Sequence, residues 1–227
     1  MAEVARALRA LSTDYVERRR GTSRTRREPL AGRGKRAAFA LFYAPLHFLV
    51  VREIIRAAGL VRPVDTVVDL GCGTGAAGAA WSSILERPPG VIGVDRQGSI
   101  LEEAAATYRR FGSAPTIVRG TTVEVRWPRR PFGVVAAYTV NELDPAERDH
   151  LLDRLLEPNP RRAAVLVVEP IAKSVAPWWP RWTARFIEHG GQSGEFRFHL
   201  ALPSIVRALD RAARLDHREQ TARALWL

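Results

Sequence analysis

The first part of the chain has apolar residues at the spacing of amphipathic helices. Four of them lie three or four positions apart: Val4, Leu8, Leu11 and Tyr15. This spacing predicts a helix over residues 1–20 with one apolar face. A second apolar segment, residues 37–58, predicts another helix, and Pro45 interrupts or kinks it because proline cannot donate a backbone hydrogen bond.

From residue 64 onward, short apolar and β-branched runs alternate with helical patterns. The short runs predict buried parallel strands at residues 66–70, 91–95, 116–119, 134–140 and 163–169. Helices are predicted at residues 75–85, 99–110, 145–156 (with Asp144 as N-cap) and 203–214, and a last strand at 217–227. This alternation favours an α/β fold with a doubly wound, mainly parallel, Rossmann-like sheet.

Positive charge is concentrated near the N-terminus. The 227 residues carry a net charge of +11, and residues 1–36 hold 11 Lys and Arg against 4 Asp and Glu, or +7. The Gly- and Arg-rich run at residues 18–36 is typical of a solvated arm or of an arm that follows a phosphate backbone. A nucleic-acid partner is therefore one hypothesis, and a chain that uses arginine for any surface charge is the other.

Cysteine content and hydropathy limit the cellular compartments that fit this sequence. Cys72 is the only cysteine, so one chain can build neither a disulfide framework nor a thiolate metal site, which fits a reducing, cytoplasmic location. The most apolar stretch, residues 37–51, is shorter than a membrane span and contains Pro45 and His47. We expect no membrane span and no secretory signal.

The stretch V-V-D-L-G-C-G-T-G-A-A-G, residues 67–78, contains two glycine patterns. Gly73, Gly75 and Gly78 fit G-x-G-x-x-G, which cradles a pyrophosphate. Asp69 with Gly71, Gly73 and Gly75 fits D-x-G-x-G-x-G. A carboxylate at the strand end repels a pyrophosphate and attracts an ammonium group, whereas glycines let the backbone approach a ligand closely. S-adenosylmethionine has an ammonium group and no phosphate.

The segment from residue 64 to 170 resembles the class I S-adenosylmethionine-dependent methyltransferases. V-D-L-G-C-G-T-G matches their first motif, and V-I-G-V-D-R supplies a second element. The resemblance implies that Asp95 accepts hydrogen bonds from both ribose hydroxyls. The predicted cofactor-binding residues are Asp69, Gly71, Cys72, Gly73, Gly75, Asp95 and Arg96. A nicotinamide-dependent oxidoreductase is the alternative.

Two positions in the cofactor region qualify this assignment. Cys72 lies between the loop glycines, where it is expected to be a small buried residue and not a nucleophile. Many members of the family hold the adenine amino group with an acidic residue after the third strand. Here that segment reads V-R-G-T-T-V-E, so Thr121, Thr122 or a backbone group would take this role.

The predicted acceptor side follows the fourth strand, in A-A-Y-T-V-N-E-L-D-P. Tyr138 and Asn141 are expected to face the methyl group, with the amide holding an amino or hydroxyl group of the acceptor. Glu142 is the candidate general base. The alternative is that Asn141 caps the next helix and Glu142 is solvated. Methyl transfer to a nitrogen or oxygen nucleophile is predicted, with positioning as the main catalytic effect.

Y-T-V-N-E-L and the later V-L-V-V-E-P resemble the ribosomal small-subunit assembly methyltransferase-like family, although this chain lacks the cysteine cluster that many of its members carry. The resemblance implies ribosomal RNA as acceptor, and the basic arm favours RNA in general. A small-molecule acceptor and a catalytically idle, cofactor-binding assembly factor are the alternatives.

We divide the chain into a basic helical extension, residues 1–59, which would be a substrate lid or RNA-binding arm, and a methyltransferase domain, residues 60–227.

Aromatic residues gather in S-V-A-P-W-W-P-R-W-T-A-R-F, which contains Trp178, Trp179, Trp182 and Phe186. These rings would stack on bases, enclose an acceptor pocket, or form a packing platform under the N-terminal helix. His47 and His189 have no ligand spacing around them, so structural roles are expected for both.

Overall fold

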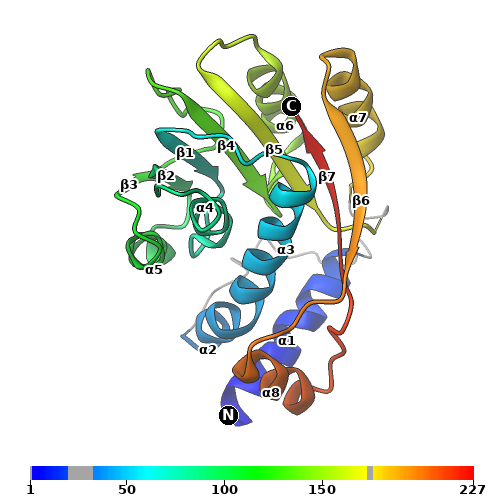
Figure 1. Cartoon of the computed structure of the whole chain (residues 1–227). Coiled ribbons are helices and arrows are strands. Elements are labelled where there is room, and N and C mark those ends of the chain that lie inside the picture. Colours follow the sequence, from blue (N-terminus) through cyan, green and yellow to red (C-terminus); the bar gives the residue numbers. More distant parts are fainter. Residues whose placement is uncertain (1, 20–32, 173–175) are drawn as a thin grey trace.

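The computed structural model describes residues 2–19, 33–172 and 176–227 (Figure 1). Most of the predicted basic arm, residues 20–32, lies outside the described part of the chain. The described residues form an α/β structure around one sheet, with an all-helical layer at one end of it (Figure 1).

The sheet has seven strands in the order β3-β2-β1-β4-β5-β7-β6. They are β1 (Thr66–Leu70), β2 (Gly90–Asp95), β3 (Pro115–Arg119), β4 (Phe132–Ala137), β5 (Arg162–Glu169), β6 (Gln192–Phe198) and β7 (Gln220–Trp226). β1 to β5 pair in parallel, and β7 runs antiparallel to both of its neighbours. The predicted doubly wound, mainly parallel sheet is confirmed.

One strand prediction was wrong in part, and one strand was not predicted. β4 ends at Ala137 and not at residue 140, because Tyr138 turns the chain out of the sheet with a φ of 58°. β6 was missed, since its alternating exposed and half-buried residues pair only with β7 at the sheet edge and make no long apolar run. The alternation is a local strand pattern, but the segment is too polar to resemble the buried strands at the centre of the sheet.

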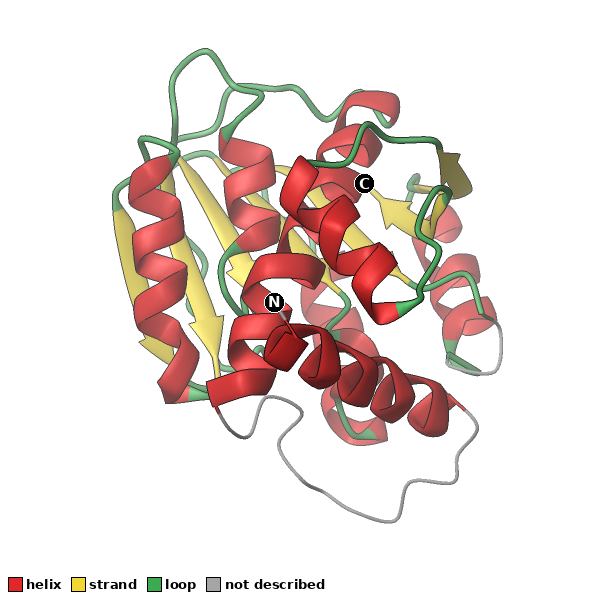
Figure 2. Cartoon of the chain, turned by 90° about the horizontal axis from the view of Figure 1, so that it is seen from below, coloured by secondary structure: helices red, strands yellow, loops and turns green. Residues whose placement is uncertain are grey.

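Helices cover both faces of the sheet (Figures 1 and 2). One face holds α3 (Ala44–Ala57), α4 (Ala76–Ser82) and α5 (Leu101–Arg110), and the other holds α6 (Pro145–Leu156) and α7 (Trp179–Glu188). Side chains alternate along each strand, so Val67 packs in the first layer and Val68 in the second. Asp144 caps α6 in a capping box with Glu147, as its position before the helix predicts.

α7 was not predicted, although its pattern is helical. Trp179, Trp182 and Phe186 are spaced three and four residues apart and are buried between the sheet and α6. Trp178 remains half-buried. Three of the four aromatic rings therefore do pack, but against the sheet, not under the N-terminal helix.

The N-terminal helices form a third packed layer with the C-terminal part of the chain. α1 (Ala2–Arg19) packs against α8 (Ser204–Ala213), and Leu8 and Leu11 are buried there, which confirms the predicted apolar face. This layer includes Ile100, which follows β2 directly after its carboxyl end. The layer thus lies at the edge of the sheet where the parallel strands end.

The second predicted helix is continuous but changes its pitch before Pro45. α2 (Arg33–Ala38) passes through a π-helical turn, Phe39–Tyr43, into α3, where Pro45 occupies the first turn. The Ala44 N–H donates to the Phe39 carbonyl, five residues earlier. Wide turns of this kind accommodate a proline inside a helical segment.

Among the described residues, one helical segment, Gly34–Ala57, is long and apolar enough by composition to cross a membrane. Core helices of globular domains have the same composition. Here the α3 part packs against α4 and β7 through buried residues that include Val50, Ile54 and Ile55. One face of α3 is therefore part of the core.

Candidate cofactor and acceptor site

The sheet creates a crevice where the chain leaves β1 and β4. These strands are neighbours, but the chain passes from β1 to α4 on one face and from β4 to α6 on the other. The loops after their carboxyl ends therefore diverge, which is the usual position of a ligand in open α/β sheets. The predicted cofactor loop and the predicted acceptor segment are these two loops.

The glycine loop has backbone angles that favour glycine. Gly71, Gly73 and Gly75 have φ values of 65°, 53° and 86°. At Gly71 a Cβ atom would lie 2.2 Å from Cγ2 of Thr139, whereas at Gly73 nothing lies within 4 Å of that position. The Thr139 hydroxyl donates to the Leu70 carbonyl at 3.1 Å. Thr139 thus fixes the base of the loop, and Gly73 faces open space.

Asp69 is buried beneath this loop, with 1% of its surface exposed. Its Oδ2 accepts hydrogen bonds from the Gly78 N–H at 2.7 Å and from the Tyr108 hydroxyl at 2.9 Å. A Cβ at Gly78 would lie 2.8 Å from this oxygen, so the third glycine of G-x-G-x-x-G serves packing. Burial raises the pKa of Asp69 to about 7.

These contacts give Asp69 a different task from the predicted one. Its carboxylate joins β1, α4 and α5. Like Val67, two residues earlier, Asp69 lies on the face of the sheet that α3, α4 and α5 cover. The predicted direct contact with an ammonium group has no support in this geometry and stays a prediction. The adjacent Cys72 thiol is also buried, and burial raises its pKa well above the ordinary value, which does not suit a nucleophile.

Asp95 lies at the end of β2 and is half-buried. Its Oδ2 accepts from the Gly73 N–H at 2.9 Å and its Oδ1 from the Gln97 N–H at 2.8 Å. Asp95 therefore joins the two loops that the sequence assigns to the cofactor. Arg96 is exposed and forms a salt bridge with Glu147 on α6, so its guanidinium is engaged across the crevice.

The acceptor segment is held to the end of β5. The buried Glu169 carboxylate accepts from the Val140 N–H at 2.8 Å, from the Asn141 N–H at 3.3 Å and from the Asn141 amide. The Asn141 oxygen accepts from the Trp178 indole at 3.2 Å. Burial raises the pKa of Glu169 to about 8.

Both the nitrogen and the oxygen of the Asn141 amide thus have protein partners. These contacts match neither of the two predicted roles, a contact with the acceptor or a helix cap. Asp144 caps α6 instead. Glu142 is exposed on a short 3₁₀ turn, Val140–Glu142. The roles of Asn141 and Glu142 toward an acceptor stay predictions. Glu169 was not predicted as a site residue, although V-V-E-P places a carboxylate at the end of a predicted buried strand.

Tyr138 lies where β4 ends, and its ring stacks on His47 of α3, with centroids 4.0 Å apart. His47 therefore lies beside the predicted acceptor segment, although it is 91 residues earlier in the chain. Burial lowers its pKa to about 4, so the imidazole is neutral at physiological pH.

Residues 67–158 match the protein family described as "Methyltransferase domain". These residues form a class I S-adenosylmethionine-dependent methyltransferase domain. No curated protein matches the chain. The matched segment runs from β1 to the end of α6, and S-adenosylmethionine is the cofactor of this methyltransferase.

Solved structures share the fold of the methyltransferase at low sequence identity. The N-methyltransferase NodS of Bradyrhizobium japonicum, in complex with S-adenosyl-L-homocysteine, is 12% identical, with a TM-score of 0.55 over 87% of this chain and 92% of its own. A Nostoc punctiforme protein provisionally assigned as an O-methyltransferase is 16% identical, with a TM-score of 0.57 over 99% and 70%. A Pyrococcus horikoshii protein provisionally assigned as an RNA methyltransferase is 14% identical, with a TM-score of 0.53 over 79% of each chain.

Three buried polar atoms in the methyltransferase crevice test its fit to the cofactor. Thr74 Oγ1, Gln97 Nε2 and Thr122 Oγ1 are buried and have no hydrogen-bond partner among the described residues. Each follows the carboxyl end of β1, β2 or β3. Unpaired buried polar groups are costly, so a polar ligand that pairs with them would stabilise the loops. Thr121 instead donates to Glu124 at 2.8 Å, which favours Thr122 as the adenine contact.

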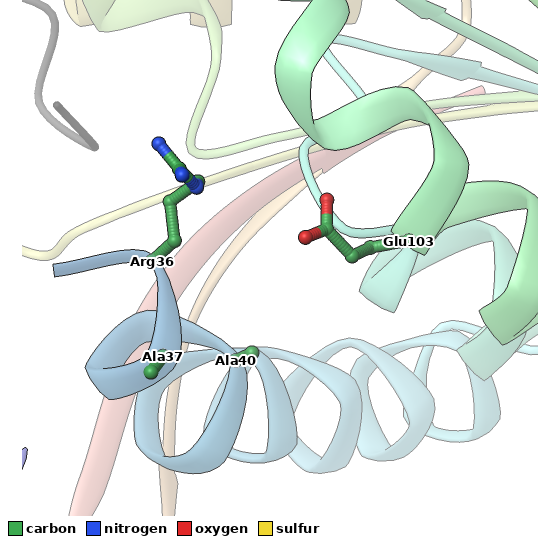
Figure 3. Close-up of a pocket in the computed structure, with 4 residues that line it drawn as sticks. All are labelled: Arg36, Ala37, Ala40 and Glu103. Atoms are coloured by element: carbon green, nitrogen blue, oxygen red, sulfur yellow. The ribbon is translucent and has the colours of Figure 1, made fainter. Parts of the chain in front are cut away.

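The methyltransferase also has a pocket beside this crevice, between α2 and α5. Figure 3 shows Arg36 and Glu103 on its two sides, with Ala37 and Ala40 below them. Its volume of about 250 Å³ lies below the range of roughly 300–1,000 Å³ for ligand pockets. No residue of the predicted site lines it, so we do not assign the cofactor or the acceptor to it.

Proposed function

We propose that this methyltransferase transfers its methyl group to a nitrogen or oxygen atom of RNA, with ribosomal RNA as the first candidate. The observation that carries the proposal is the charge of +11, of which residues 1–36 contribute +7. Lys and Arg side chains bind the phosphates of a polyanion and release its counterions.

The charge of the described helical layer supports the same acceptor. α1 and α8 pack together, and arginines on both helices and at the end of α8 are exposed: Arg6, Arg9, Arg207, Arg211 and Arg214. Arg9 also donates to the Ala212 carbonyl at 3.1 Å, which ties the two helices to each other. These arginines would extend the contact of the N-terminal segment with an RNA backbone.

In this proposal the cofactor lies along the loops after β1, β2 and β3. Asp95 and the backbone of the glycine loop hold it from one side, and Gln97 and Thr122 pair with its polar edges. S-adenosylmethionine supplies an activated methyl group on a sulfonium. The residues after β4 then position the nucleophile, because orientation of the two reactants accounts for much of the acceleration.

RNA binding is tested by the salt dependence of affinity for deproteinised ribosomal RNA. We expect Arg207→Gln/Arg211→Gln to weaken binding and to reduce the slope of log affinity against log salt by roughly 0.7 per lost contact. The matched control is Arg109→Gln/Arg110→Gln, which removes two exposed charges from α5, away from α8. Equal slopes for the two double variants would contradict the proposed RNA surface.

A small-molecule acceptor is the second candidate, and the helical layer favours it. α3 reaches the acceptor segment through the contact of His47 with Tyr138, so this layer would cover a small substrate as a lid. Methyl incorporation from labelled S-adenosylmethionine into total RNA, compared with a small-molecule extract, discriminates between the candidates. Label in the extract alone would reject the RNA acceptor. Label in neither, with cofactor binding intact, would favour the idle assembly factor.

A further inference from the structure

A group of aromatic rings lies where the helical layer meets the acceptor segment. Tyr138 and His47 stack with an interplanar angle of 23°. Tyr43 and Phe39 follow on the preceding turns, with ring centroids 6.2 Å and 5.8 Å from that of His47. All four rings are half-buried, whereas Phe42 on the same helical segment is fully buried. We call these four residues the ring cluster.

The ring cluster lies next to the cofactor loop. Tyr138 directly precedes Thr139, whose side chain packs against Gly71 and bonds to the Leu70 carbonyl. The Tyr138 N–H donates to the Val168 carbonyl at 2.8 Å, which anchors this residue to β5. An acceptor that touches the ring of Tyr138 would therefore be close to the loop that holds the cofactor.

The backbone of Tyr138 is strained. Tyr138 and Arg214 are the two non-glycine residues with positive φ among residues 2–19, 33–172 and 176–227. A bulky aromatic residue rarely adopts this conformation, and strain of this kind is concentrated at functional sites. Here the left-handed turn ends β4 and directs the Tyr138 ring onto His47.

His47 adds a polar edge to this apolar surface. Its imidazole makes no hydrogen bond within the described part of the chain, and it is neutral. A neutral imidazole has one donor and one acceptor nitrogen, so it can pair with the edge of a planar heterocycle. The ring cluster thus combines faces for stacking with one group for hydrogen bonding.

We propose that the ring cluster receives the base of an acceptor nucleotide, so that the methylated atom is a base nitrogen and not a ribose oxygen. This inference rests on the proposed RNA acceptor. Bases stack favourably on aromatic side chains, whereas a ribose has no π face, and enzymes that modify bases take them out of the stack. In the reaction a nitrogen lone pair forms the bond to the methyl carbon, the methyl–sulfur bond breaks with its electron pair left on sulfur, and the nitrogen releases a proton to water.

The first test uses the full chain with deproteinised total RNA and methyl-labelled S-adenosylmethionine. The RNA is digested to nucleosides, and the labelled products are identified by mass spectrometry. We expect label in base-methylated nucleosides. Label confined to 2′-O-methyl nucleosides would overturn this inference and leave the RNA acceptor intact. Label absent from RNA but present in a small-molecule extract would reject the proposed function, and this inference with it.

The second test uses substitutions in the ring cluster. Tyr138→Leu and His47→Leu should each lower kcat/KM for RNA on the order of tenfold, while S-adenosylmethionine affinity measured by calorimetry changes less than twofold. His47→Phe keeps a ring for stacking but removes both ring nitrogens, so it should recover only part of the loss. Phe48→Leu is the matched control, because Phe48 is half-buried on the same helix but packs at a tilt against Phe111, outside the ring cluster. Unchanged kcat/KM in Tyr138→Leu would reject the role of the cluster.

Discussion

The Tyr108 hydroxyl donates a hydrogen bond to the Asp69 carboxylate across 2.9 Å inside the core. Tyr108 comes from α5, is fully buried, and would collide with a Cβ at Gly75, Gly78 or Gly93. The glycines of this region thus make room for the Tyr108 ring as well as for a ligand. Asp69 ties the glycine loop to the second βα unit through this ring.

This burial predicts a pH dependence of stability. The pKa of Asp69 is raised to about 7, above an unfolded value of roughly 4, so the folded state keeps a proton that the unfolded state loses. The stability from the protonated form is complete below about pH 4 and is lost as the pH rises to about 7. Asn does not titrate, so between pH 5 and 7 the free energy of unfolding of Asp69→Asn should fall less steeply than that of the unsubstituted protein. The difference should be on the order of 1 kcal/mol per pH unit.

Urea denaturation at several pH values measures this difference. Glu169 titrates in both proteins and cancels in the comparison. Asp65→Asn makes the same chemical change at an exposed position before β1 and should keep the dependence of the unsubstituted protein. If Asp69→Asn and the unsubstituted protein have parallel profiles, Asp69 is ionised in the folded state throughout this range.

The contact of Gly71 with Thr139 predicts a large effect of a single methyl group. Gly71→Ala would combine a positive φ with a Cβ only 2.2 Å from Cγ2 of Thr139, so we expect a loss of about 3 kcal/mol or more in the free energy of unfolding. Gly59→Ala has the same kind of φ, 67°, but nothing within 4 Å, so it should lose about 1 kcal/mol. Equal losses would show that the overlap relaxes without cost.

Asn141 is predicted to be a structural residue of the acceptor segment. Asn141→Ala removes a donor to the buried Glu169 and the acceptor of the Trp178 indole, so it should lower the free energy of unfolding by about 1–3 kcal/mol. Glu142→Gln changes an exposed side chain and should cost less than about 0.5 kcal/mol. If Asn141→Ala loses methyl transfer while its thermal stability is unchanged, the predicted direct contact of Asn141 with the acceptor is supported instead.

Asp95 is expected to bind the cofactor. Asp95→Ala removes the predicted acceptor of the ribose hydroxyls and the bonds to the Gly73 and Gln97 N–H groups, so S-adenosylmethionine affinity should fall by about tenfold or more. Calorimetry with Asp65→Ala as control measures this change, because Asp65 is exposed before β1. An unchanged affinity would exclude Asp95 from the cofactor site.

Local patterns were sufficient for most elements of the fold. β1 matches its predicted range, and α6 begins after its predicted cap, because buried strands and helix caps depend on neighbouring residues. α7 has a helical spacing of buried aromatics that was readable, but the sequence analysis treated these rings as either a binding surface or a packing platform and predicted no helix. β6 could not be predicted in this way, since its pairing partner, β7, lies beyond α8 in the chain.

The sequence by itself determined the fold class and the cofactor, because the glycine motif, Asp95 and the strand–helix alternation are each confined to short segments. Only the tertiary structure decided what the polar side chains of the site contact. Tyr108 lies 39 residues from Asp69, Glu169 lies 28 residues from Asn141, and His47 reaches Tyr138 from the N-terminal helices. Such partners depend on how faces and loops of distant segments meet, and a local pattern of apolar and polar residues carries no information about that.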